Sequence, residues 1–515
     1  MIQVLRHLFR ARWFVFRFSF DKKPSASPIH APGESIIKIN EIIKHRWQIV
    51  LIIATIIALA RMLGNTLYDY GTYPPINRDA VLYQYEGWLI TQGRVLYVDL
   101  WELKPPLAAE TPAILAVISG DDMLLLHWLN LALVCVMVIG SVWLVGQLVY
   151  DDTHNAEAAI VAGLALLTLT FFTRLGALGF RPKYLTLFFG LLSIVLADRD
   201  HPFWSGVCLA LSAGHWQPGA FFIPVAGWQM FRKHGLRHAW VPRMILGAAL
   251  VTFLAVLPNI IDGSLNTMFD QVVKVNFEQP NQKFGLTRAI EKVVELVRFA
   301  LVVWIWGTLG IIWSLTRLQA KRGWLVIGFV LFAVQVVEID FDSTPDLFVI
   351  MSFVAMGTGM WFADIMSGDV RSHAPQAAVV IGGVAVLIVA WLIWQYTRVG
   401  HRHPGAVVAS TLALVPLAGL IWREKLVRIG IILVLGLTLI LSVGLMDTDG
   451  LVYKERQPIR LSDPFVESSE ERLGMPSLAY MYWHRVMPPG CHILLSTTEL
   501  RYMQKKGQTL ESDCR

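Results

Sequence analysis

Apolar segments alternate with short polar stretches from residue 47 to residue 445. A helix needs about 20 residues to cross a bilayer, and helices satisfy their own backbone hydrogen bonds in lipid. The pattern predicts an all-α polytopic membrane protein with about thirteen transmembrane helices, counting the fifth segment below as two. The segments are Trp47–Leu63, Met123–Val149, Ala158–Phe172, Tyr184–Ala197, Phe203–Phe231, Ile245–Ile261, Phe299–Leu315, Trp324–Val337, Leu347–Met366, Ala377–Tyr396, Ala406–Trp422 and Ile429–Leu445.

The segment Phe203–Phe231 differs from the others because polar or basic residues that we place on the same side flank both of its ends. The sequence Gly214-His215-Trp216-Gln217-Pro218-Gly219 interrupts its middle. Proline and glycine break helices, so the segment is interpreted as a hairpin of two short helices. Counted as two, it gives seven helices up to Ile261.

The distribution of charge predicts the orientation. Residues 1–46 are rich in arginine and lysine, which places this segment in the cytoplasm, against anionic headgroups. The loop between the first two spans and the tail 447–515 then lie outside. The basic loop Arg398–His403 is also placed outside and fits the rule poorly.

Composition agrees with this class, since 55% of residues are hydrophobic, 16% are charged and the mean hydropathy is +0.53. The net charge of +6 is spread over loops and indicates orientation rather than binding to nucleic acid. No cysteine spacing is typical of a zinc site, and no motif indicates a cofactor, although a divalent metal stays compatible with the carboxylates. Cys491 and Cys514 are candidates for a disulfide if the tail lies outside.

The first outer loop carries the densest set of polar, aromatic and acidic residues. It contains Asn77-Arg78-Asp79, the stretch Gly93-Arg94-Val95-Leu96-Tyr97-Val98-Asp99, and Lys104-Pro105-Pro106 just before an apolar run. This order resembles the first extracytoplasmic loop of GT-C glycosyltransferases. The relatives are the protein mannosyltransferases, the lipid A aminoarabinose transferases and the archaeal dolichol-phosphate-mannose mannosyltransferases. The seven helices to residue 262 likewise resemble the shared GT-C module.

The resemblance implies transfer of a hexose, with mannose as first choice, from a dolichyl or polyprenyl phosphate to a glycan or protein acceptor at the outer face, with inversion. A lipid-linked donor explains why no nucleotide-binding domain is needed. We therefore divide the chain into a basic segment 1–46, a catalytic module 47–262, a variable membrane module 263–446 and an outer tail 447–515. Membrane lipids, the lipid donor and the acceptor are the expected partners.

The resemblance also assigns two residues. The Asp of the loop, here Asp79, acts as or helps to form the base that deprotonates the acceptor hydroxyl; the alternative is an N-cap of a helix beginning at Ala80. The Lys of the loop, here Lys104, lies near the donor phosphate; the alternative is a lysine that extends to the interface.

Other candidates come from the residues themselves. Arg181 and Lys183 lie at an outer helix start, where phosphate is favoured, although they could merely anchor the helix at the interface. Substrate-binding candidates, each also open to a structural role as turn acid, interfacial aromatic or helix-break histidine, are Asp99, Glu102, Tyr83 and His215. The acidic stretch Glu338–Asp346 could bind acceptor hydroxyls or a divalent ion, or be a solvated loop. Residues Leu286–Val297 have the spacing of an amphipathic surface helix.

Two rival functions remain. A transporter or lipid flippase is typically built from repeats with broken helices in both halves, and this chain has one broken hairpin without a matching partner. An oligosaccharyltransferase carries a larger soluble domain than the tail 447–515 offers.

Overall fold

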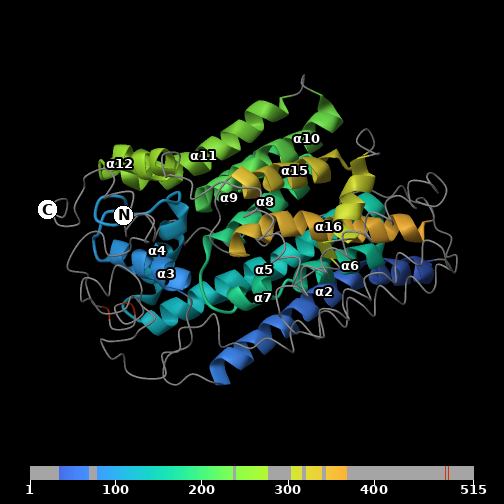
Figure 1. Cartoon of the computed structure of the whole chain (residues 1–515), viewed down its shortest axis with the longest axis horizontal. Helices are drawn as coiled ribbons and strands as arrows, with labels where there is room; N and C mark the ends of the chain where they lie inside the picture. Colours follow the sequence, from blue (N-terminus) through green and yellow to red (C-terminus); the bar gives the residue numbers. More distant parts are fainter. Residues whose placement is uncertain are drawn as a thin grey trace, which may run out of the picture. The chain divides into compact units, whose positions relative to one another are not determined.

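The computed structural model of the chain (Figure 1) describes residues 34–68, 78–235, 239–276, 303–304, 306–315, 321–338, 344–367, 482 and 485. Contacts divide the chain into Met1–His45 and Arg46–Arg515. The described residues are helical or loop, with no named strand among them, as the all-α prediction requires. The helices are α2 (Glu34–Tyr68), α3 (Arg78–Thr91), α4 (Leu107–Ser119), α5 (Met123–Thr153), α6 (Ala156–Leu167), α7 (Thr170–Gly176), α8 (Pro182–Asp198), α9 (Pro202–His215), α10 (Phe222–His234), α11 (Trp240–Ile261), α12 (Leu265–Phe269), α15 (Gly323–Glu338) and α16 (Phe348–Met366), with short 3₁₀ or π segments η1 (Gln217–Phe221), η2 (Asp270–Val275) and η3 (Thr344–Leu347).

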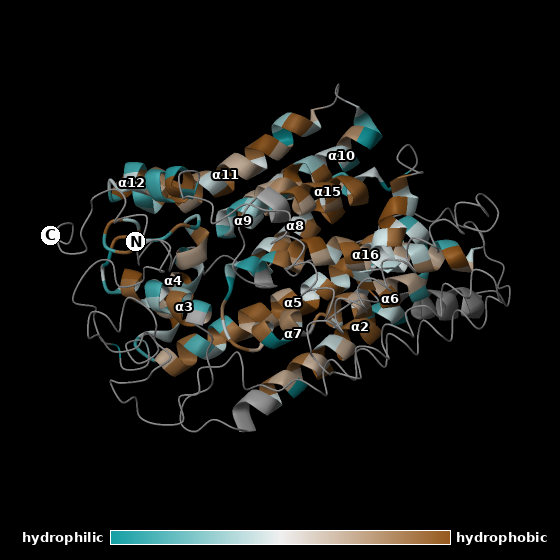
Figure 2. Cartoon of the chain, viewed as in Figure 1, coloured by the Kyte–Doolittle hydropathy of each residue, from teal (hydrophilic) through white to brown (hydrophobic). Residues whose placement is uncertain are grey.

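Within the described residues, four helices are long and apolar enough to cross a membrane: Arg46–Gly64, Met123–Thr153, Trp240–Ile261 and Phe348–Met366. Shorter apolar helices are Leu107–Ser119, Ala156–Leu167, Trp306–Leu315 and Gly323–Gln335. Figure 2 shows hydrophobic residues along most of α5, α11, α15 and α16. The chain is a multi-pass membrane protein, and the count of thirteen stays a prediction. Segments 286–297, 377–396, 398–403, 406–422 and 429–445 lie outside the described residues, as do Cys491 and Cys514.

The centre of the helical bundle is α16, which packs on α5, α6 and α15 and is buried along its whole apolar window. By contrast α11 buries only 22% of its window and packs mainly on α9. An apolar helix that exposes most of its surface is stable in lipid but not in water. The exposed side of α11 is therefore a lipid-facing surface.

The predicted span Ala158–Phe172 is wrong as a single helix. Helix α6 ends at Leu167, and Leu169 adopts an extended backbone before α7 begins. The Thr168 hydroxyl donates to the Ala165 carbonyl at 2.7 Å. A threonine hydroxyl that bonds to the preceding turn competes with the backbone ladder, so this residue favours the break.

The predicted hairpin is present. Helix α9 ends at His215, Trp216 is extended, and η1 leads into α10. Both helices pack on α8, and α9 also packs closely on α11. A side chain at Gly206 would clash with the Met244 carbonyl, so glycine is required for this close approach.

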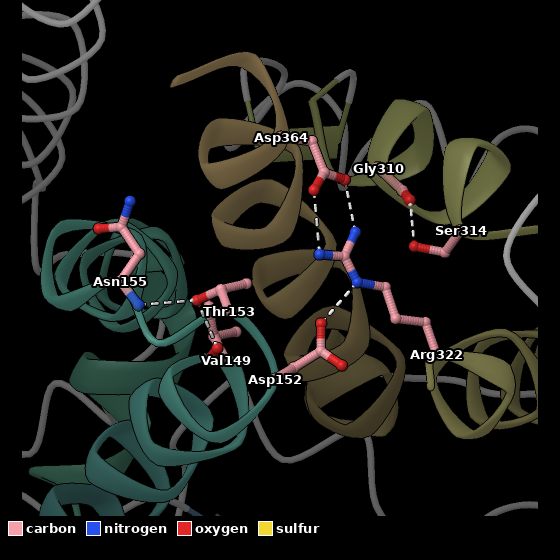
Figure 3. Close-up of polar contacts among 8 residues, drawn as sticks. All are labelled: Val149, Asp152, Thr153, Asn155, Gly310, Ser314, Arg322 and Asp364. Atoms are coloured by element: carbon pink, nitrogen blue, oxygen red, sulfur yellow. Dashed lines mark hydrogen bonds and ion pairs between the residues drawn. The ribbon is translucent and has the colours of Figure 1, made fainter. Parts of the chain in front are cut away.

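A buried arginine joins three helices (Figure 3). Arg322, which is 6% exposed, donates through Nε to Asp152 at 2.6 Å, next to the end of α5. Its two terminal nitrogens bind both oxygens of Asp364 on α16, with Nη2–Oδ1 at 3.0 Å. Such a bidentate pair fixes geometry as well as charge. Arg322 thus ties the start of α15 to α5 and α16.

The first outer loop contains two helices, α3 and α4, which pack on each other. Helix α3 begins at Arg78, so the expectation that it begins at Ala80 with Asp79 as its cap is wrong. Asp79 lies in the first turn instead, where a negative charge is still favourable. That position leaves its carboxylate 46% exposed.

Candidate active site

The segment between α3 and α4 is held in one conformation by its own side chains. Tyr97 has a positive φ of 68°, unusual for a residue with a side chain. Its buried ring reaches along the loop, and its hydroxyl donates to the Lys104 carbonyl at 2.8 Å. Asp99 accepts from the Val95 backbone N–H at 2.7 Å, which is the role of a turn acid. Asp99 therefore shapes the loop.

Two distant segments clamp this loop from outside. Gln271 of η2 accepts from the Glu102 N–H at 3.1 Å and donates to the Tyr97 carbonyl at 2.9 Å. Gln217, at the break of the hairpin, donates to the Leu103 carbonyl at 2.5 Å. These amides satisfy buried backbone groups that would otherwise be costly. The residues just before Lys104 are thus fixed by η1 and η2.

Lys104 follows directly from this clamped segment. Its backbone N–H donates to the Glu102 carboxylate at 2.7 Å, and its ammonium lies 4.9 Å from the centre of the Tyr83 ring. Burial opposes the charge of Lys104, but the Tyr83 oxygen, Glu102 and Asp79 favour it, so its pKa lies above the ordinary value. Lys104 is therefore a permanent cation beside α3.

Asp79 pairs with Arg181 across a distance of 2.9 Å. Arg181 belongs to a strip of three consecutive residues, Gly179 to Arg181, that lies along α3. The Phe180 ring meets the Tyr83 ring edge-on at 6.2 Å. Gly179 has a φ of +113°, and a Cβ there would lie 2.7 Å from Gln84 Nε2. Only glycine allows this approach, which brings Arg181 to Asp79.

Lys183, the second residue of α8, completes the group of cations. It is paired with Asp346 of η3, and its ammonium lies 5.4 Å from the Trp216 ring centre. It also interacts electrostatically with Lys104 and Asp79. The structure therefore gathers the predicted residues Asp79, Tyr83, Glu102, Lys104, Arg181 and Lys183 at one place, from α3, the loop before α4 and the start of α8.

His215 has a different environment. Its Nδ1 lies 2.7 Å from the Leu211 carbonyl and its Nε2 lies 2.9 Å from the Thr111 hydroxyl. These contacts tie the end of α9 to α4 and use both ring nitrogens. The structural alternative therefore accounts for His215 fully.

Residues that sequence reasoning missed are those that hold the site together: Tyr97, Gln217 and Gln271. Only Gln217 had a signal, because it lies in the predicted helix break. Asp346 was part of the acidic stretch 338–346, and the pair with Lys183 gives it a place at the site. Among the described residues, no group of three His, Cys, Asp or Glu side chains is arranged to hold a metal ion.

The arrangement combines one half-exposed carboxylate with three cations. The carboxylate can accept a proton, and the cations can stabilise negative charge on a phosphate. This is the chemistry of a group transfer in which the leaving group is a phosphate.

Comparisons with known proteins give the following findings. The family model for DolP-mannose mannosyltransferases matches residues 93–257. The chain is 28% identical over 346 residues to the dolichol phosphate-mannose mannosyltransferase of Haloferax volcanii, covering 67% of this chain and 72% of that protein. The structure of ArnT from Cupriavidus metallidurans bound to undecaprenyl phosphate is 14% identical, with a TM-score of 0.42 and 78% of each chain covered. The oligosaccharyltransferase AglB from Archaeoglobus fulgidus is 12% identical, with a TM-score of 0.43, covering 73% of this chain and 56% of that one. The family and sequence matches confirm the predicted resemblance to membrane mannosyltransferases.

Proposed function

We propose that this chain is a membrane glycosyltransferase that transfers mannose from a dolichyl or polyprenyl phosphate to a glycan or protein acceptor. The observation that carries the proposal is the meeting of Asp79 with Lys104, Arg181 and Lys183. The sequence similarity to the dolichol phosphate-mannose mannosyltransferase of Haloferax volcanii supports the choice of donor and sugar. Residues 47–262 form the catalytic module in this proposal, and the matched residues 93–257 lie within it.

In the proposed reaction, the Asp79 carboxylate takes the proton of an acceptor hydroxyl. The oxygen attacks the anomeric carbon from the face opposite the phosphate, and the bond between that carbon and the phosphate oxygen breaks with inversion. The electron pair stays on the lipid phosphate, which gains one negative charge, while Asp79 becomes a neutral acid.

The cations have separate parts in this step. Lys104 and Lys183 face the phosphate and stabilise the charge that it gains, an effect that is strong where water is excluded. Arg181 orients the Asp79 carboxylate before the donor arrives. It can then share its remaining N–H groups with the phosphate, since a guanidinium has five donors. Asp79 is the most exposed of these groups, so it is the one that an acceptor can reach.

The proposed site lies on the extracytoplasmic face, with the N-terminus in the cytoplasm and the tail outside. This orientation rests on the basic segment 1–46 and the acidic first loop. The lipid donor then enters from the bilayer beside the site.

Transfer of radiolabelled mannose from dolichyl-phosphate mannose by the purified full-length chain in lipid nanodiscs tests the function. Label should move to a glycan or peptide fraction, and free dolichyl phosphate should appear in equal amount. Glucosyl and aminoarabinosyl phosphate lipids serve as alternative donors. Transfer from none of them, by protein that is folded and monodisperse, would refute the proposal. Mass spectrometry of glycans from a deletion strain would identify the acceptor by its missing hexose.

A further inference from the structure

Tyr482, far along the chain, lies against the helices that carry the candidate active site. Tyr482 is completely buried in a cluster with residues of α3, α4 and α5. Its hydroxyl donates to Gln84 Oε1 at 2.8 Å, a contact between residues 398 positions apart. Arg485 donates to the Asp121 carbonyl at 3.3 Å, two residues before α5 begins. Tyr482 and Arg485 therefore have a specific seat against the first outer loop and the residues just before α5.

Gln84 lies between Tyr482 and the strip that carries Arg181, the partner of Asp79. Its Oε1 receives the Tyr482 hydroxyl and also lies 3.3 Å from His127 Nδ1. With the oxygen held in this way, the amide Nε2 points to Gly179, where even a methyl group would lie only 2.7 Å from it. A rotated or displaced Gln84 would therefore push against the strip that carries Arg181.

The strip Gly179–Arg181 is packed too tightly against α3 to accommodate such a displacement locally. Gly179 packs on Ala80 and Gln84, Phe180 packs on Tyr83, and Arg181 reaches Asp79, so three consecutive residues follow one face of α3. A shift at Gly179 is transmitted two residues on to the ion pair. Tight packing transmits small displacements because it leaves no room for local relaxation.

We propose that Tyr482 is a positioning residue for the transfer reaction: through Gln84 and Gly179 it fixes the Arg181–Asp79 pair. The proposal deepens the proposed function and rests on it for its kinetic consequences. Its structural core, the coupling of Tyr482 to the strip, is independent of which sugar is transferred.

The kinetic test uses Tyr482→Phe, which removes one hydroxyl and keeps the buried ring. We expect kcat to fall roughly threefold to tenfold, the value of one buried hydrogen bond, with KM for the lipid donor unchanged. Gln84→Met should give a similar loss, and the double variant no more than the larger single loss. Tyr150→Phe, at the other end of α5, is the matched control and should leave kcat unchanged.

A double-mutant cycle with Arg181→Lys separates positioning from general stability. If Tyr482 acts through Arg181, its effect on kcat should largely disappear in the Arg181→Lys background. Independent, multiplying losses would refute the coupling, because residues without shared partners have additive free energies.

Hydrogen exchange provides a readout that does not need the reaction. In Tyr482→Phe, backbone amides of residues 78–84 and 178–181 should exchange faster, while those of α16 should not change. Unchanged exchange in both segments would overturn the proposal even if transfer is active. If the wild type transfers no sugar but Tyr482→Phe still exchanges faster than the wild type in both segments, the coupling is supported and only the proposed function is refuted.

Discussion

At the scale of single residues, the site depends on the contrast between Asp79 and the cations around it. Asp79 is half-exposed, whereas Arg181 and Lys183 are nearly buried. A carboxylate in contact with solvent can exchange a proton with an acceptor, whereas a cation held away from solvent can contact a bound phosphate without competition from water. The two types of residue should therefore differ when they are removed.

Asp79→Asn keeps the size of the side chain but removes the base. Turnover should fall by about 10²–10⁴ with donor affinity largely kept.

Lys104→Met should weaken donor binding and slow the departure of the phosphate, and Lys104→Arg should recover part of both. The assay is transfer of labelled mannose, normalised to folded protein.

Asp200→Asn, at an exposed carboxylate beyond the end of α8, is the control and should not affect transfer. Near-normal turnover in Asp79→Asn would remove Asp79 as the base. Glu102 would then be the next carboxylate to test, since Asp99 is occupied by its turn.

Glu110 is a second residue whose environment makes a prediction. Burial in the first turn of α4 raises its pKa to about 8. In the unfolded chain a glutamate releases its proton near pH 4.3, so between about pH 4.3 and 8 the unfolded state binds fewer protons and is favoured as pH rises. Stability supplied by neutral Glu110 is therefore present at low pH and is lost across this window.

The melting temperature of the wild type should accordingly fall between pH 5 and pH 8 more steeply than that of Glu110→Gln, whose amide does not titrate. Thermal unfolding in detergent at fixed ionic strength measures the difference. Parallel curves for the two proteins would show that Glu110 does not retain its proton.

At the scale of elements, the clearest test is the arginine that joins α5, α15 and α16. Arg322→Met leaves Asp152 and Asp364 buried without their cation, which should cost about 3–5 kcal/mol of unfolding free energy. Arg322→Lys should cost less but not be neutral, because an ammonium cannot bind both oxygens of Asp364 and reach Asp152. Thermal melts in nanodiscs give the comparison.

The triple variant in which Arg322, Asp152 and Asp364 become Met, Asn and Asn should recover much of that loss, since no buried charge remains. A triple variant as unstable as Arg322→Met would show that lost packing, not the uncompensated charge, causes the damage.

The positions of many helices could be predicted from the sequence. Hydropathy located α5, α8, α11, α15 and α16 closely, and the Pro218–Gly219 pair located the break between α9 and α10. The break after Leu167 could not be predicted, because a threonine in an apolar run is equally compatible with a continuous helix. Within the outer loop, a helix near α3 entered the sequence analysis only as an alternative, and α4 was not predicted as a helix, since it is shorter than a full span.

In the candidate site, too, some residues could be predicted from the sequence and others could not. Charged residues at the starts of elements, such as Asp79, Lys104 and Arg181, stood out because charge is rare in this chain. The residues that hold them depend on contacts across 104 to 398 positions, such as His215 with Thr111 and Tyr482 with Gln84. Periodicity carries no information on contacts of that range, and the left-handed backbone of Tyr97 has no signature in its sequence.

At the scale of the whole molecule, the tail connects two predictions that the sequence made separately. The first loop and residues 447–515 were each placed outside, by charge and by counting spans. Tyr482 is buried against α3 and α4, so this residue and the first loop must be on the same side of the membrane, whichever side that is. The prediction that an odd number of spans follows a cytoplasmic N-terminus can therefore be tested directly.

We expect a reporter that is active only outside the cytoplasm to give signal when fused to Arg515. In a cysteine-free background, Gln92→Cys in the exposed turn after α3 should react with a membrane-impermeant maleimide in intact cells. Asp200→Cys, after the end of α8, should react only once the membrane is permeabilised. Labelling of Asp200→Cys in intact cells with protection of Gln92→Cys would invert the whole topology and put the site in the cytoplasm. An inactive reporter with the expected pattern of labelling would instead contradict the seat of Tyr482, because one face cannot hold the first loop while the other holds a tail that packs against it.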